Sequence, residues 1–142
     1  TISLSRAKVE NLSRLFNVHL YSSAEMAYKY AMEELSAAKS IDYKSGIGMA
    51  HYHLGVYYNN TDQADSAKYY YLLAKDQFEQ INDLDRIISV NHGLAIIAYS
   101  QGNYDEAIER LKSNVTINLE NEYDSLINER DLNLAIHNVD CY

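Results

Sequence analysis

The chain has 142 residues, 47% of them hydrophobic and 23% charged, which is the balance of a folded globular protein. Twenty acidic residues against twelve basic ones give a net charge of −8, so direct binding to nucleic acid or to an anionic membrane is not expected. Cys141 is the single cysteine, which excludes an internal disulfide and a cysteine-based zinc site. Since no apolar run approaches the ~20 residues of a membrane span, we also expect no membrane contact by this segment.

The spacing of apolar residues predicts helices along the whole chain and no strand. Apolar residues in the segment 46–58 recur at intervals of three and four, which is one stripe of a helix, and the segment 64–78 repeats the pattern. The polar break at 59–62 has the length of a turn between antiparallel helices. In chain order, the predicted helices cover residues 3–20, 23–40, 45–60, 63–80, 84–101, 104–119 and 124–140.

Turn and capping residues mark several of these boundaries. Gly102 can take the left-handed conformation that often ends a helix. Asn103 with Glu106, and Ser22 with Glu25, have the spacing of capping boxes for the helices that follow them. The last predicted helix has no stop signal, so we expect the chain to be a piece of a longer protein.

The sequence repeats itself with a period of 40 residues. Small and apolar residues keep their places in the repeat while polar residues vary, as expected where each unit buries its side against the next. The aligned columns include Ala27, Ala67 and Ala107; Leu54, Leu94 and Leu134; Ile47, Ile87 and Ile127; and Gly55, Ala95 and Ala135. The repeat predicts a single domain over 1–142, built from units at 3–40, 45–80 and 84–119 and a final helix at 124–140.

The second unit resembles the tetratricopeptide repeat (TPR) family. Its residues read His51-x-x-Leu54-Gly55-x-x-Tyr58 and then Ala67-x-x-x-Tyr71-x-x-Ala74, with histidine where tryptophan is usual. This resemblance implies an all-α, right-handed superhelical solenoid of antiparallel helix pairs, with about seven helices. Two features depart from the family: the period exceeds the usual ~34 residues, and the chain has no proline. Either the connections carry extra residues or the helices are longer.

Long, proline-free repeats with the linker Ser-Ile-Asp-Tyr-Lys-Ser-Gly-Ile at 40–47 are similar to TPR segments of bacterial regulators. In such proteins the array often precedes a membrane helix and a histidine kinase or DNA-binding output domain. The resemblance therefore implies, as an alternative function, a sensory input domain that couples ligand or partner binding to an attached output. Its compartment would be the cytoplasm, or the periplasm if the regulator is anchored in a membrane.

The family resemblance also implies where a partner would bind, because the first helix of each TPR unit lines the concave face. The partner-binding positions carried over to this chain are Val9, Leu12, Phe16, His19, Tyr52, Val56, Asn59, His92, Ile96 and Tyr99. This wall contains no Lys or Arg, so a clamp for a terminal carboxylate is not expected, and a helix or extended segment with apolar anchors suits it better. Two alternatives remain open: these side chains pack on another part of the same protein, or Phe16 and Ile96 are ordinary core.

No residue pattern points to catalysis, a metal or a cofactor. His51 and His53 are two apart on a helix and point in different directions, so we expect a packing role for the first and partial exposure of the second. Glu33 and Glu34 are expected on a solvated helix face. The sequence thus favours a non-enzymatic protein–protein interaction module that binds a protein or peptide. The apolar residues of the predicted last helix, at 126–139, also predict end-to-end association into a homo-oligomer.

Overall fold

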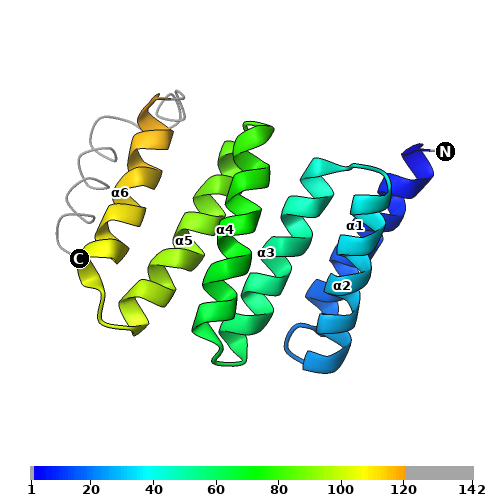
Figure 1. Ribbon diagram of the computed structural model, residues 1–142, viewed down its shortest axis with the longest axis horizontal. Coiled ribbons are helices and arrows are strands. Elements are labelled where there is room, and N and C mark those ends of the chain that lie inside the picture. Colours follow the sequence, from blue (N-terminus) through cyan, green and yellow to red (C-terminus); the bar gives the residue numbers. More distant parts are fainter. Residues whose placement is uncertain (1, 121–142) are drawn as a thin grey trace. The chain divides into compact units, whose positions relative to one another are not determined.

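The computed structural model describes residues 2–120, and within this range the chain is six consecutive helices with no strand (Figure 1). The helices are α1 (Ile2–His19), α2 (Ala24–Ser40), α3 (Lys44–Asn60), α4 (Ala64–Gln80), α5 (Leu84–Ser100) and α6 (Tyr104–Glu120). Each of the first six predicted helices is confirmed, with both ends within one residue of the expected position. The helix predicted over 124–140 lies outside the described residues.

Long helices, rather than long connections, account for the 40-residue period. Each helix from α2 to α6 has 17 residues. The turns between them are three residues each, at 41–43, 61–63, 81–83 and 101–103. Of the two explanations left open by the sequence, the longer helix is therefore the right one.

These four turns share one backbone geometry. The middle residue of each has a positive φ: Asp42 (49°), Asp62 (58°), Asn82 (54°) and Gly102 (78°). Asp, Asn and Gly are the residues that adopt this left-handed conformation most easily. In each turn the next N–H donates to a carbonyl five residues earlier, for example from Gln63 to Tyr58 at 2.9 Å, which is the hydrogen bond of a Schellman cap. The turns therefore repeat every 20 residues, at half the period of the sequence.

The turn between α1 and α2 is one residue longer and is capped differently. Ser23 is the N-cap of α2, and its Oγ accepts a hydrogen bond from the Met26 N–H at 3.3 Å. The capping box expected at Ser22 is thus wrong by one residue, because the extra turn residue moves the extended backbone of the N-cap to position 23.

The chain divides into two compact units, Thr1–Val90 (unit 1) and Asn91–Tyr142 (unit 2), with the boundary inside α5. In unit 1, α2 packs against α1 and α3, and α3 packs against α4, with each helix antiparallel to the next (Figure 1). In unit 2, α5 and α6 meet through Ala95, Ala98 and Ala107. The expected all-α, solenoid-like packing of consecutive helices is confirmed. No helix in the described range is both long and apolar enough to cross a membrane.

Small residues sit where paired helices come closest. Ala27, Ala67 and Ala107 occupy the same place in the second helix of each pair, and their side chains are 0%, 0% and 6% exposed. A Cβ added to Gly55 would lie 2.6 Å from Cδ1 of Tyr71, so α3 and α4 approach too closely there for any side chain. The repeating columns of small residues therefore mark the helix crossings, as the sequence predicted.

Candidate binding site

An apolar groove of about 240 Å³ runs between α5 and α6 in unit 2. The residues that line it are His92, Ala95, Ile96, Tyr99, Tyr104, Ala107, Ile108 and Leu111. Three of these, His92, Ile96 and Tyr99, are positions that the TPR resemblance assigned to partner binding. We call this feature the α5–α6 groove.

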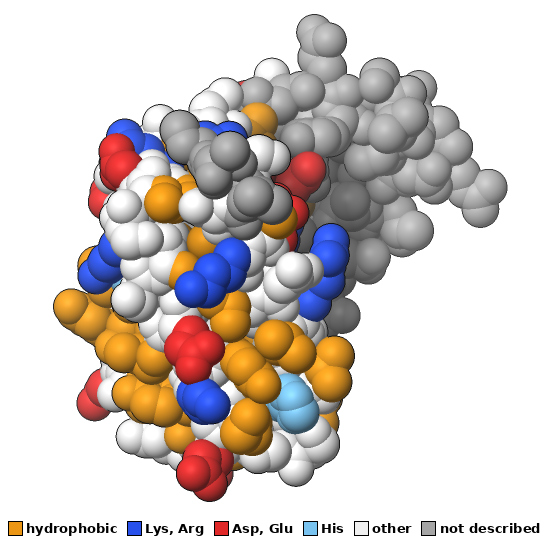
Figure 2. Space-filling view, turned by 90° about the vertical axis from the view of Figure 1, so that its right-hand side faces the viewer, with side chains coloured by type: hydrophobic (Ala, Val, Ile, Leu, Met, Phe, Trp, Pro, Cys, Tyr) orange, Lys and Arg blue, Asp and Glu red, His pale blue; other side chains and the backbone are white. Residues whose placement is uncertain are grey.

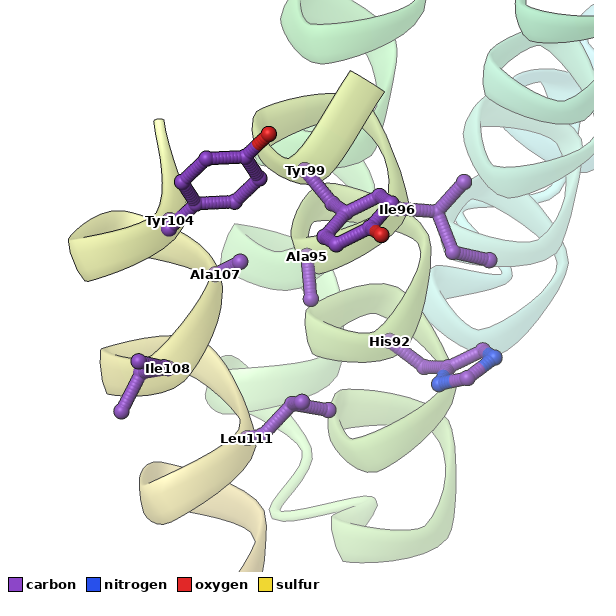
Figure 3. Close-up of a pocket in the computed structure, with 8 residues that line it drawn as sticks. All are labelled: His92, Ala95, Ile96, Tyr99, Tyr104, Ala107, Ile108 and Leu111. Atoms are coloured by element: carbon purple, nitrogen blue, oxygen red, sulfur yellow. The ribbon is translucent and has the colours of Figure 1, made fainter. Parts of the chain in front are cut away.

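The helix pair presents short side chains inside the groove and long ones around it (Figure 3). Ala95 and Ala107 project between the helices and leave space there. At one end, the rings of Tyr99 and Tyr104 meet edge to face with their centroids 5.3 Å apart. Ile96 is 46% exposed and Tyr99 is 64% exposed, so both have apolar surface free for contact. The groove therefore combines an aromatic end, an aliphatic wall and room for an inserted side chain.

A buried polar contact sets the register of this helix pair. The amide nitrogen Nδ2 of Asn91, a fully buried residue of α5, donates to Oδ1 of Asn114 in α6 at 2.9 Å. Because a buried amide without a partner costs free energy, one arrangement of α5 against α6 is favoured over its neighbours. This pair was not predictable from the sequence, because the two residues are 23 positions apart and asparagine usually lies at the surface.

In unit 1, three of the expected wall residues belong to the core instead. Val9, Leu12 and Phe16 are 1%, 7% and 0% exposed. The Phe16 ring stacks on the imidazole of His53, with the centroids 4.2 Å apart. The helical period identified the apolar face of α1 but not that α2 and α3 cover it, so these three side chains are corrected from partner contacts to interior packing.

The other expected wall residues of unit 1 are partly accessible. Val56, Asn59, His19 and Tyr52 are half-buried. The His19 ring stacks on Tyr30, and the Tyr52 ring lies 5.7 Å from that of Tyr71. Burial raises the pKa of Tyr52 although the nearby Arg86 guanidinium acts in the opposite direction. His19, Tyr52 and Val56 already pack within unit 1, so they offer less free surface than Ile96 and Tyr99 do.

A buried pair of polar side chains in hydrogen-bond contact lies between α2 and α3. The Oε2 of Glu34 is 2.7 Å from Nδ1 of His53, and the two side chains are 0% and 3% exposed. Glu34 is therefore an interior residue and not part of a solvated helix face, and His53 is not partly exposed as expected. Both expectations failed for one reason: each residue finds its polar partner on a neighbouring helix, which local periodicity cannot show.

A second cavity, of about 280 Å³, lies between α1 and α3 in unit 1 and is polar. The polar side chains that line it are Glu10, Ser13, Arg14, Glu34, Ser45 and Arg86. The TPR resemblance assigned no Lys or Arg to the wall, and neither arginine of this cavity occupies one of those wall positions. We call this feature the α1–α3 cavity.

Unit 1 also has an exposed apolar face. Figure 2 looks at the side formed by α1 and α2 and shows hydrophobic side chains gathered on its lower half. Leu15 and Val18, near the end of α1, are 38% and 69% exposed. This face is the main competitor of the α5–α6 groove as an apolar contact surface.

Comparison of the chain with protein-family models, with curated proteins and with solved structures gives no match. The TPR resemblance therefore stays a prediction from the sequence. Within residues 2–120, no group of three His, Cys, Asp or Glu side chains is placed to hold a metal ion.

Proposed function

We propose that this chain is a non-enzymatic protein-interaction module whose α5–α6 groove binds a helix with an apolar face. The observation that carries the proposal is the pair of exposed apolar side chains, Ile96 and Tyr99, on the wall of a groove with space between its helices. Tyrosine is enriched at protein interfaces because one side chain supplies a large apolar area and a polar tip. A helix that inserts one aliphatic side chain above Ala95 and Ala107 would bury this surface.

Charge supports a protein partner over a nucleic acid. The chain carries −8 overall, and the groove lining contains no charged residue other than the titratable His92. A polyanion would gain nothing there, whereas an apolar helix flanked by basic residues would be attracted to the acidic protein. We therefore expect the partner helix to have apolar anchors at intervals of three and four residues and a basic outer face.

A displayed library of amphipathic helices, selected against the full chain, tests the proposal. We expect the selected sequences to share that pattern, and Tyr99→Ser to weaken their binding by about tenfold or more, as for an aromatic residue at the centre of an interface. Tyr69→Ser is the matched control, because Tyr69 is 59% exposed on α4 and lies outside the groove. Equal affinity of the wild type and the Tyr99 variant would overturn the assignment of the groove.

The segment 121–142 is the competing occupant, as the sequence allows packing within the same protein. Binding of the selected helices to the full chain and to a version ending at residue 120 distinguishes the two cases. If the selected helices bind the full chain as tightly as a version ending at residue 120, the groove is open to a partner. If they bind the shortened chain alone, the groove belongs to the chain's own C-terminal segment.

A sensory input domain is the second candidate function. The observation that favours it is the polar α1–α3 cavity, because a scaffold that binds only apolar helices has no need of a hollow lined by charged side chains. In this case a small ligand would alter the packing of α1 against α3 and so bias an attached output domain.

A further inference from the structure

We propose that the α1–α3 cavity binds a small zwitterion carrying an ammonium group and a carboxylate, such as a free amino acid. The cavity lies in unit 1 and shares no lining residue with the α5–α6 groove, so this inference does not depend on the proposed interaction function.

The carboxylate of Glu34 is the first part of the site. It is 0% exposed, and its Oε2 is taken by His53. Its other oxygen, Oε1, is buried and has no hydrogen-bond partner among the described residues. A buried carboxylate oxygen without a donor is costly, so a ligand that brings an N–H donor is favoured there. Since Glu34 lines the cavity, an ammonium group bound against its carboxylate would supply that donor together with a compensating charge.

The arginines are the second part of the site. Arg14 and Arg86 line the same cavity from α1 and α5, and both are exposed. Guanidinium groups bind carboxylates through paired hydrogen bonds. The lining carries two acidic side chains, Glu10 and Glu34, beside the two arginines. A ligand with a single charge would pair with only one of these two sets of side chains, whereas a zwitterion would pair with both.

The size of the cavity limits the ligand. At about 280 Å³ it lies just below the range of ordinary ligand pockets, which occupy roughly 300–1,000 Å³. The hydroxyl groups of Ser13 and Ser45 and the side chain of Met49 complete its wall and offer further contacts to a small polar molecule. A free amino acid fits this space, and a folded partner does not.

The test is titration of the full chain with a panel of free α-amino acids at millimolar concentration, followed by calorimetry and by the midpoint of thermal unfolding. We expect at least one to bind saturably and to raise the midpoint, because a ligand that binds the folded state alone stabilises it. The N-acetyl derivative of that amino acid lacks the cation, and its amide lacks the anion. Both derivatives should bind at least tenfold more weakly.

Variants assign the contacts. Arg14→Gln and Arg86→Gln change exposed residues, so both should fold, and each should weaken binding by about tenfold. Arg110→Gln removes a guanidinium from α6 and should leave binding unchanged. Glu34→Gln should weaken binding further if it folds, and the two arginine variants decide the matter if it does not. The proposal is overturned if no amino acid binds, which is the result expected if ordered water satisfies Glu34. It is also overturned if the N-acetyl derivative binds as tightly as the free amino acid, or if the arginine variants bind the amino acid as tightly as the wild type does.

Discussion

His51 is a buried side chain whose protonation makes the free energy of unfolding depend on pH. The side chain is 7% exposed, and its Nδ1 has no hydrogen-bond partner among the described residues. Burial, with a smaller contribution from the positive charge of Lys39, lowers the pKa of His51 to about 4. The folded state therefore holds His51 neutral at pH values where the unfolded chain would protonate it.

We predict that the free energy of unfolding falls as the pH drops from about 6.5 to about 4, by on the order of 3 kcal/mol from this group. The sign follows from the lowered pKa, because the unfolded state binds more protons across that window. Urea unfolding of the wild type and of His51→Gln at several pH values measures the effect. The difference between the two proteins should shrink towards acid, and a constant difference would contradict the assignment.

Gly102 gives a prediction free of packing effects. Its φ is +78°, and a Cβ built on it would meet nothing within 4 Å. Gly102→Ala should therefore lower the free energy of unfolding by about 1–2 kcal/mol through backbone strain alone. Gly102→Asn should lose less, because asparagine tolerates the left-handed region. Chemical denaturation of the three proteins provides the measurement, and an unchanged stability of the alanine variant would show that the turn is not left-handed.

Among the elements, the helices and their ends were predictable because their signals are local. Helical periodicity indicates the segments, and the turn residues at positions 42, 62, 82 and 102 recur at 20-residue spacing within the 40-residue period. The covering of Phe16 and the pairing of Glu34 with His53 could not be predicted in the same way. Both depend on which face of one helix meets the next, and a single helix period carries no information on that choice.

The crossing of paired helices at Ala67 supplies a test at this scale. Ala67 is fully buried on α4, so Ala67→Leu should overpack the contact and lower the free energy of unfolding by about 1–3 kcal/mol. Ala24→Leu is the matched control, because Ala24 is exposed at the start of α2. Thermal unfolding of both variants measures the difference. Equal midpoints for the two would mean that the repeat register is wrong.

For the whole molecule, the two units offer different kinds of surface. Unit 1 contains a charged cavity and the exposed apolar face of α1 and α2, whereas unit 2 contains the α5–α6 groove. The sequence predicted His92, Ile96 and Tyr99 of that groove, but not the arginine-lined cavity, because the TPR resemblance assigned neither arginine to the wall. A protein that binds a partner and a small ligand at separate units accommodates both candidate functions.

The expected self-association is measured by light scattering over a range of concentrations. We expect the apolar residues at 126–139 to join chains, so the mean mass should rise with concentration. Leu132→Asp should reduce that rise. A mass that stays at one chain throughout would count against a homo-oligomer.

Binding of a partner helix in the α5–α6 groove is tested most directly by an NMR titration of the isotope-labelled full chain with a selected amphipathic helix. We predict that the amide signals shifted by the helix cluster in α5 and α6, around Tyr99, Tyr104 and Leu111. Shifts confined to the α1–α2 face around Leu15 and Val18, with α5 and α6 unaffected, would contradict it.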